Sequence, residues 1–121
     1  MELDNLVKEI AKLKFVSAIF LFGSQVNGRA RKDSDIDVCV LTKNASRKQE
    51  LQAQGFSNDK IDISIFSRLP LVIQFRVLKE GKLIFCKDEM YLHDTKYETF
   101  RRYPDYSYFI KNFYRRVIKN V

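Results

Sequence analysis

The stretch Gly23–Asp37, which reads GSQVNGRARKDSDID, lies between two apolar runs, and the rest of the chain is arranged around it. The run before it is Ala18–Phe22 (AIFLF), and the run after it is Val38–Leu41 (VCVL). Continuous apolar runs are typical of strands that are buried on both faces. We therefore predict strands over residues 17–22 and 36–41, joined by a polar connection that contains two glycines.

The connection ends in two aspartates, Asp35 and Asp37, with Ile36 between them. Side chains alternate between the faces of a strand, so the two carboxylates point the same way while Ile36 points into the core. Neighbouring carboxylates repel each other unless a cation lies between them. Hard oxygen ligands favour a hard metal ion, most simply Mg²⁺ that carries substrate phosphates.

The connection begins with a Gly23-Ser24 corner that directly follows a buried strand. Such a corner presents backbone N–H groups, and the start of a short helix expected over residues 25–29, to an anion. An ordinary turn glycine is one interpretation of Gly23. The other is that only a residue without a Cβ lets the backbone approach a triphosphate, and the aspartates downstream favour it. Ser24 is expected to cap the short helix and Gly28 to end it.

Gly23-Ser24, ten intervening residues and Asp35-Ile36-Asp37 together resemble the signature of the DNA polymerase β-like nucleotidyltransferase superfamily. The short chain most resembles the minimal nucleotidyltransferases (MNT), stand-alone domains that often pair with a HEPN protein. This resemblance implies an α/β (α+β) nucleotidyltransferase fold, with a small mixed sheet of about four strands flanked by helices. It covers roughly residues 1–103, and residues 104–121 then form a C-terminal helical extension of the same domain.

A third aspartate lies in the segment Ile61–Phe66, where isoleucines alternate with Asp62 and Ser64. This alternation predicts a strand with one buried face. A solvent-facing residue near a strand end is one interpretation of Asp62. The resemblance implies another: Asp62 joins Asp35 and Asp37 as catalytic residues and as ligands of two Mg²⁺ ions, and it accepts the proton of an attacking hydroxyl group.

The resemblance also implies a nucleotide site for ATP, made by Gly23, Ser24, Gly28, Arg29 and Ser34. The chain departs from many relatives at Asn27, where they carry Arg, and Arg29 or Arg31 is a candidate replacement. A solvated loop is the alternative interpretation of these basic residues. The implied reaction transfers AMP to a hydroxyl group, with release of pyrophosphate. The acceptor would be a HEPN protein, which would make this chain its antitoxin.

Composition narrows the class of protein. The chain has 121 residues and is 45% hydrophobic, enough for one domain with one core. No run is long enough to span a membrane, and two cysteines without metal-like spacing favour a reducing, cytoplasmic location. A single histidine argues against zinc catalysis and a Ser-His-Asp triad. The net charge of +7 suits an anionic partner without selecting nucleotide, nucleic acid or acidic protein.

Helical spacing and capping patterns predict further elements along the chain. The predicted helices cover residues 2–14, 47–54, 70–80, 88–103 and 107–119, and a last short strand covers 83–85. The polar segment 47–54 is expected to pack loosely. The apolar stripe of the last helix either packs on the sheet or docks a partner or a second copy.

Two other functions stay open at this stage. The chain could neutralise a partner by contact alone, although the presence of all three aspartates argues against this. It could also be a basic nucleic-acid-binding domain, for which the interleaved Tyr and Arg residues near the C-terminus are a weak signal.

Overall fold

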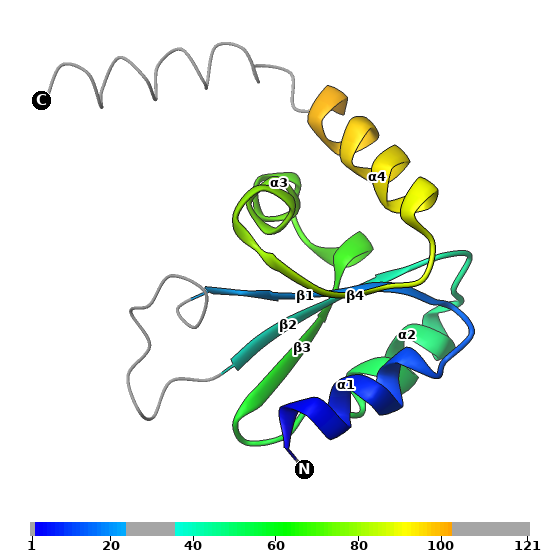
Figure 1. The fold of residues 1–121 in the computed structure, drawn as a ribbon, viewed down its shortest axis with the longest axis vertical. Helices are drawn as coiled ribbons and strands as arrows, with labels where there is room; N and C mark the ends of the chain where they lie inside the picture. The colour runs from blue at the N-terminus through cyan, green and yellow to red at the C-terminus, as the bar shows by residue number, and fades with distance from the viewer. Residues whose placement is uncertain (1, 24–35, 103–121) are drawn as a thin grey trace, which may run out of the picture.

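The structure, a computed structural model, describes residues 2–23 and 36–102. Figure 1 shows a four-stranded sheet with helices on both faces. The strands are β1 (Val16–Phe22), β2 (Ile36–Thr42), β3 (Ile61–Ile65) and β4 (Lys82–Cys86). Their order is β3-β2-β1-β4; β1 is antiparallel to both of its neighbours, and β2 and β3 are parallel. The predicted mixed sheet is confirmed.

The helices form two layers. They are α1 (Leu3–Ala11), α2 (Arg47–Gln54), α3 (Leu71–Glu80) and α4 (Glu89–Arg102), with a short 3-10 helix, η2 (Phe66–Arg68), after β3. In Figure 1, α1 and α2 lie on one side of the sheet, and α3 and α4 on the other. A parallel pair of strands requires a crossover connection, and α2 supplies it between β2 and β3.

Alternating side chains give the sheet a separate core on each face. On one face, the isoleucines of β3 and Val38 and Val40 of β2 pack with Leu6 and Ile10 of α1. On the other face, Phe20 and Cys39 pack with residues of α3 and α4. Full burial of one such aliphatic side chain contributes about 1.5–3 kcal/mol. Because both faces of β2 are buried along most of its length, this strand is fixed in the sheet.

The helices depart from the sequence prediction at two points. α1 ends at Ala11 rather than at residue 14, because tight turns at Leu13 and Val16 lead the chain directly into β1. The N–H of Leu13 donates to the carbonyl of Ile10, and that of Val16 to Leu13. The expectation of loose packing for α2 is wrong, because Ala53 is fully buried and Glu50 is only 4% exposed.

The end of α3 and the start of α4 agree with the prediction. A Cβ on Gly81 would collide with the carbonyl oxygen of Val77, so glycine is required where α3 turns into β4. Asp88 caps α4 by accepting a 3.0 Å hydrogen bond from the N–H of Tyr91. No helix of the described ranges is long and apolar enough to cross a membrane. The helix predicted over 107–119 lies outside the described residues.

Candidate active site

Asp37 and Asp62 lie side by side at one end of the sheet. Asp37 is near the start of β2, Asp62 is near the start of β3, and the two residues are Cα partners across the parallel pair. Neighbouring strands lie about 4.8 Å apart, and residues in register share a face. The alternation that buries Ile61 and Ile63 turns Asp62 to the opposite face, where it is exposed. The two carboxylates therefore lie on the same face of the sheet, on neighbouring strands.

The glycine corner adjoins this pair from the other side. Phe22, the last residue of β1, is the Cα partner of Asp37, so Gly23 follows immediately beside the carboxylate. Gly23 has a φ of +86°, and a Cβ added there would lie 2.5 Å from Oδ2 of Asp37. The corner thus lies directly beside the carboxylate of Asp37, at the end of the sheet where Asp62 also lies.

Strand directions explain why these distant residues meet. The end of β1 and the start of β2 share an edge of the sheet because the two strands are antiparallel. The α2 crossover returns the chain to the same edge, so β3 also starts there, parallel to β2. Three strand ends then contribute Gly23, Asp37 and Asp62.

The other predicted site residues lie outside the described residues. They are the catalytic Asp35 and the nucleotide-binding Ser24, Gly28, Arg29 and Ser34. In the described ranges, no group of three His, Cys, Asp or Glu residues is close enough to hold a metal ion. The three-carboxylate set stays a prediction, since it requires Asp35, two positions before Asp37.

The chemistry of the described pair suits a hard divalent cation. Both donors are carboxylates, and the thiol of Cys39, two residues further along β2, is fully buried. Like charges directly opposite each other on adjacent strands destabilise a sheet. A divalent ion bound between Asp37 and Asp62 would remove this repulsion, so the residues present fit Mg²⁺.

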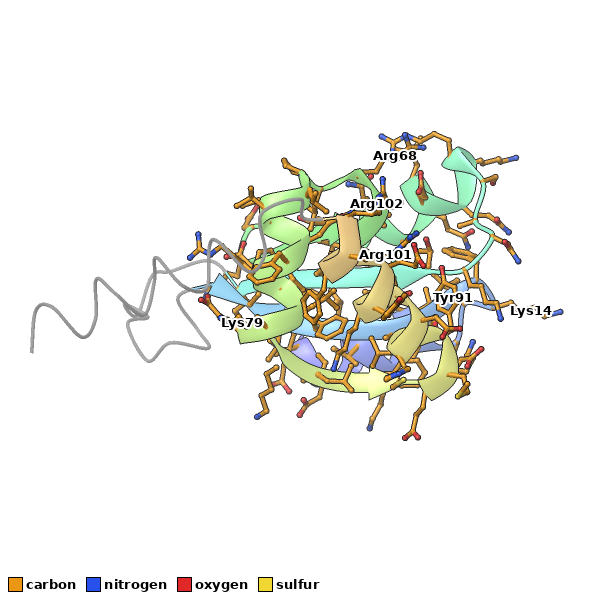
Figure 2. All side chains as sticks on the ribbon, turned by 90° about the horizontal axis from the view of Figure 1, so that it is seen from above. Lys14, Arg68, Lys79, Tyr91, Arg101 and Arg102 are labelled. Carbon is orange, nitrogen blue, oxygen red and sulfur yellow. The ribbon has the colours of Figure 1, made fainter. Side chains whose placement is uncertain are left out.

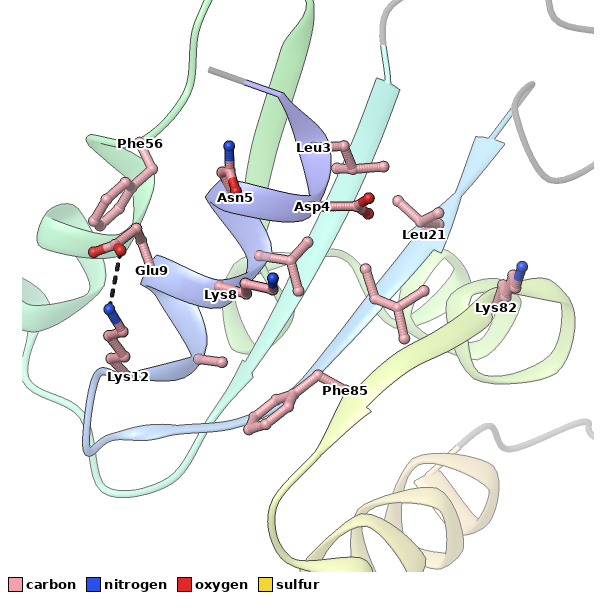
Figure 3. Close-up of a pocket in the computed structure, with 13 residues that line it drawn as sticks. Leu3, Asp4, Asn5, Lys8, Glu9, Lys12, Leu21, Phe56, Lys82 and Phe85 are labelled. Atoms are coloured by element: carbon pink, nitrogen blue, oxygen red, sulfur yellow. Dashed lines mark hydrogen bonds and ion pairs between the residues drawn. The ribbon is translucent and has the colours of Figure 1, made fainter.

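Two hollows of the described residues lie elsewhere. A groove of about 1090 Å³ runs between α1 and β4, with Leu3, Leu21 and Phe85 among its lining residues (Figure 3). A cavity of about 350 Å³ lies between α4 and the far end of β2, beside Thr42 and Thr99. Neither Asp37 nor Asp62 lines either hollow.

Glu50 is a buried residue with a structural role that the sequence did not reveal. Its buried carboxylate accepts hydrogen bonds from Nε of Arg68 at 2.9 Å and from Oγ of Ser67 at 3.0 Å. Burial acts to raise the pKa of Glu50, but the bonds from Arg68, Ser67 and Arg47 outweigh it, so the pKa is lowered. This cluster attaches the α2 crossover to η2. A glutamate in a polar helix gives no sign of burial in the sequence.

Basic side chains also mark the α3/α4 side of the molecule, toward which Asp37 and Asp62 point. Figure 2 looks onto this side and labels Arg68 of η2, Lys79 of α3, and Arg101 and Arg102 of α4. Arg101 pairs with Glu98 at 2.9 Å, which raises the pKa of its guanidinium group. His93, the single histidine, is exposed on α4.

Comparison with known structures shows the same fold in toxin–antitoxin complexes. A chain of a toxin–antitoxin complex crystallised with AMP-PNP superposes with a TM-score of 0.67 and 17% identity, covering 97% of this chain and 99% of that one. A chain from the complex of tri-AMPylated Shewanella oneidensis HEPN toxin with MNT antitoxin gives a TM-score of 0.59 and 16% identity, covering 95% and 92%. At this level of identity, the likeness shows the fold alone.

Sequence comparison is more specific. A Methanocaldococcus jannaschii protein, provisionally named a protein adenylyltransferase, is 38% identical over 83 residues, which span 69% of this chain and 66% of that protein. Residues 4–90 match the family described as polymerase beta, nucleotidyltransferase. The matched region holds the whole sheet together with Gly23, Asp37 and Asp62. The chain therefore belongs to the polymerase beta nucleotidyltransferase family.

Proposed function

We propose that this protein transfers AMP from ATP to a hydroxyl group on a partner protein and releases pyrophosphate. The observation that carries the proposal is the pairing of Asp37 with Asp62 beside the Gly23 corner. The name of the Methanocaldococcus jannaschii relative supports protein adenylylation within the family. The structural likeness to a complex crystallised with AMP-PNP is compatible with an adenine nucleotide.

The nucleotide would be bound by the corner and the connection that follows it. Backbone N–H groups at Gly23-Ser24 and the hydroxyl of Ser24 are the proposed phosphate donors. Gly28, Arg29 and Ser34 complete the proposed site. Arg29 is assigned the task of the arginine that many relatives carry where this chain has Asn27.

Asp35, Asp37 and Asp62 would hold two Mg²⁺ ions. When bound, such ions neutralise the triphosphate and lower the pKa of the acceptor hydroxyl. Asp62 is the proposed proton acceptor, because its exposed carboxylate is open to a partner on the α3/α4 side. Asp37 is held between two strands and orients the reacting groups. The acceptor oxygen forms a bond to the α-phosphorus, the bond from that phosphorus to the bridging oxygen breaks, and pyrophosphate leaves.

A HEPN protein is the proposed acceptor, and the chain would then be the MNT antitoxin of a toxin–antitoxin pair. Support comes from the solved structures with the same fold, which include a chain from the complex of a tri-AMPylated HEPN toxin with an MNT antitoxin. Transfer of AMP would inactivate the toxin covalently, rather than by contact alone.

The experiment measures transfer of label from α-³²P-ATP to a purified HEPN protein in the presence of Mg²⁺. We expect Asp37→Asn and Asp62→Asn to reduce the rate by at least about 10²-fold, because each removes a carboxylate that acts at the phosphoryl group. Asp59→Asn is the matched control, since it is the same substitution at an exposed residue close to Asp62 in the chain. Its rate should equal that of the unsubstituted protein.

Two outcomes would overturn the proposal. Normal transfer by the double variant Asp37→Asn, Asp62→Asn would show that the acidic pair is not catalytic. Full neutralisation of a toxin by the same variant, without labelling, would show that the chain acts by contact alone. Binding to RNA that salt weakens and ATP leaves unchanged would instead favour a nucleic-acid-binding domain.

A further inference from the structure

The space where a Cβ of residue 23 would lie is next to the side chain of Asp37. A Cβ added at Gly23 would lie 2.5 Å from Oδ2 of Asp37, but 3.4 Å from its Cγ and 3.6 Å from its Cβ. Only the first distance is too short for non-bonded atoms, because ordinary van der Waals contact begins near 3.4 Å. A methyl group at Gly23 would therefore conflict with one carboxylate oxygen and leave the rest of Asp37 in place.

Gly81, which lies between α3 and β4, shows the contrast. At Gly81, an added Cβ would meet the backbone carbonyl oxygens of Val77 and Leu21. That conflict is with the fold itself, between the end of α3 and β1. Among the described residues, the atoms nearest to an added Cβ at Gly23 all belong to the side chain of Asp37, a proposed catalytic residue.

Asp37 has little freedom to yield by moving its backbone. It is paired in register with Phe22 of β1 and with Asp62 of β3, so it lies in an interior strand of the sheet. The next residue, Val38, is fully buried. A group pressing on Oδ2 would consequently rotate the carboxylate about its side-chain bonds, and the shared orientation with Asp62 would be lost.

We propose that Gly23 is a positioning residue for Asp37: its missing side chain leaves the space that Oδ2 occupies when the Asp37 and Asp62 carboxylates face a common ligand. This role is additional to the approach of a phosphate to the corner. The inference rests on the proposed function for its consequence in catalysis, but the steric coupling is a property of the folded chain and is measurable without ATP.

A double-mutant cycle on stability tests the steric contact. Gly23→Ala, Asp37→Ala and the double variant are compared with the unsubstituted protein by urea unfolding without metal or nucleotide. Gly23→Ala should lower the midpoint through two causes, the positive φ and the conflict with Oδ2. The Asp37→Ala background removes the carboxylate and relieves only the second. We expect the loss of midpoint to fall by at least half in that background. An equal loss in both backgrounds would overturn the proposal.

Metal affinity tests the positioning role directly. Mn²⁺ binding is followed by electron paramagnetic resonance in the absence of nucleotide. Gly23→Ala should weaken binding at least tenfold, since the rotated carboxylate no longer faces the ion together with Asp62. Gly55→Ala is the matched control, because Gly55 has a helical φ of −62° at the end of α2. Unchanged Mn²⁺ affinity in Gly23→Ala, with affinity lost for ATP only, would show that the glycine serves the phosphates alone.

The variant Gly23→Asn tests the proposal if Gly23→Ala does not fold. Asparagine tolerates positive φ better than alanine does, yet it keeps the Cβ. It should fold and still lose Mn²⁺ affinity; full affinity in this variant would contradict the proposal.

The experiments distinguish a failure of the proposed function from a failure of the role proposed for Gly23. An absence of AMP transfer by the unsubstituted protein to any acceptor contradicts the enzymatic proposal, whereas coupling in the cycle and tenfold weaker Mn²⁺ binding still support the role of Gly23. An absence of Mn²⁺ binding by the unsubstituted protein would contradict both the metal site and its positioning.

Discussion

The buried carboxylate of Glu50 and the guanidinium of Arg68 form the contact that fastens the crossover helix to the turn after β3. Nε and Nη2 of Arg68 both lie 2.9 Å from Oε1 of Glu50, while Ser67 binds the other oxygen at 3.0 Å. Half of the Arg68 side chain remains in solvent, but only 5% of the Glu50 side chain does. The crossover that aligns β3 with β2 is thus held by a buried carboxylate, that of Glu50, whose two oxygens both bind groups of η2.

Glu50→Gln should destabilise the fold by about 1–2 kcal/mol, because a neutral amide cannot accept all three donors and leaves buried polar groups unmatched. Urea unfolding at pH 7 measures the loss. Glu80→Gln is the matched control, because Glu80 forms an exposed pair with Arg76 at 3.8 Å, which contributes little. Equal losses in the two variants would contradict the structural role of Glu50.

The same contact predicts how stability depends on pH. The folded state lowers the pKa of Glu50, so this residue contributes stability above the ordinary glutamate pKa of about 4.3. That contribution is lost as the pH falls through the lowered pKa of the folded state. We expect the difference in urea midpoint between the unsubstituted protein and Glu50→Gln to shrink between pH 6 and pH 3. A difference that stays constant over this range would be the contrary result.

Mg²⁺ should stabilise the folded chain through Asp37 and Asp62. A ligand present at 100 times its dissociation constant adds about 2.7 kcal/mol to the stability of the state that binds it. Thermal unfolding with increasing Mg²⁺ should show a rising midpoint in the unsubstituted protein and in Asp59→Asn. The rise should vanish in Asp62→Asn, and a rise of equal size in that variant would locate the ion elsewhere.

The hydroxyl of Tyr91 donates a 2.9 Å hydrogen bond to the carbonyl of Thr42 and ties the first turn of α4 to the end of β2. Figure 2 shows Tyr91 on α4. Tyr91→Phe should cost about 1 kcal/mol, because the ring is kept and only this bond is lost. Tyr97→Phe, at a residue that is 64% exposed, should leave stability unchanged. Chemical unfolding of the two variants in parallel gives the comparison.

Cys39 should resist alkylation until the protein unfolds. The side chain is fully buried, and this burial raises the pKa of its thiol to about 12. The thiolate is the reactive form, and at pH 8 its fraction would be on the order of 10⁻⁴. Iodoacetamide should therefore modify Cys86, which is half-buried, well before Cys39. Peptide mapping after a timed reaction distinguishes the two sites, and equal rates would show that the β2 core opens readily.

Local patterns were sufficient to predict most elements. The predicted strand over 17–22 appears as Val16–Phe22, and the predicted helix over 47–54 has the same bounds in the structure. That helix has a clear start signal, because Ser46 and Gln49 form a reciprocal capping box. Runs of apolar residues and caps are short-range features, so they can be recognised without knowledge of the fold.

Pairings between distant segments could not be predicted from the sequence. The burial of Glu50 depends on Arg68, which follows it by a whole strand, and no spacing rule links the two residues. The contact between Gly23 and Asp37 likewise depends on β1 and β2 being neighbours in a given register. The family resemblance implied that Asp62 joins Asp37 in one site, but their alignment as Cα partners required the sheet.

The isoleucines of β3 have a consequence beyond the core that they fill. Sliding β3 by one residue along β2 would bring Asp62 into the hydrophobic interior and expel Ile61 and Ile63 into water. A chain with this register would lose most of its hydrophobic core on this face, so it would not stay folded. The register that keeps the protein folded therefore also keeps Asp62 beside Asp37.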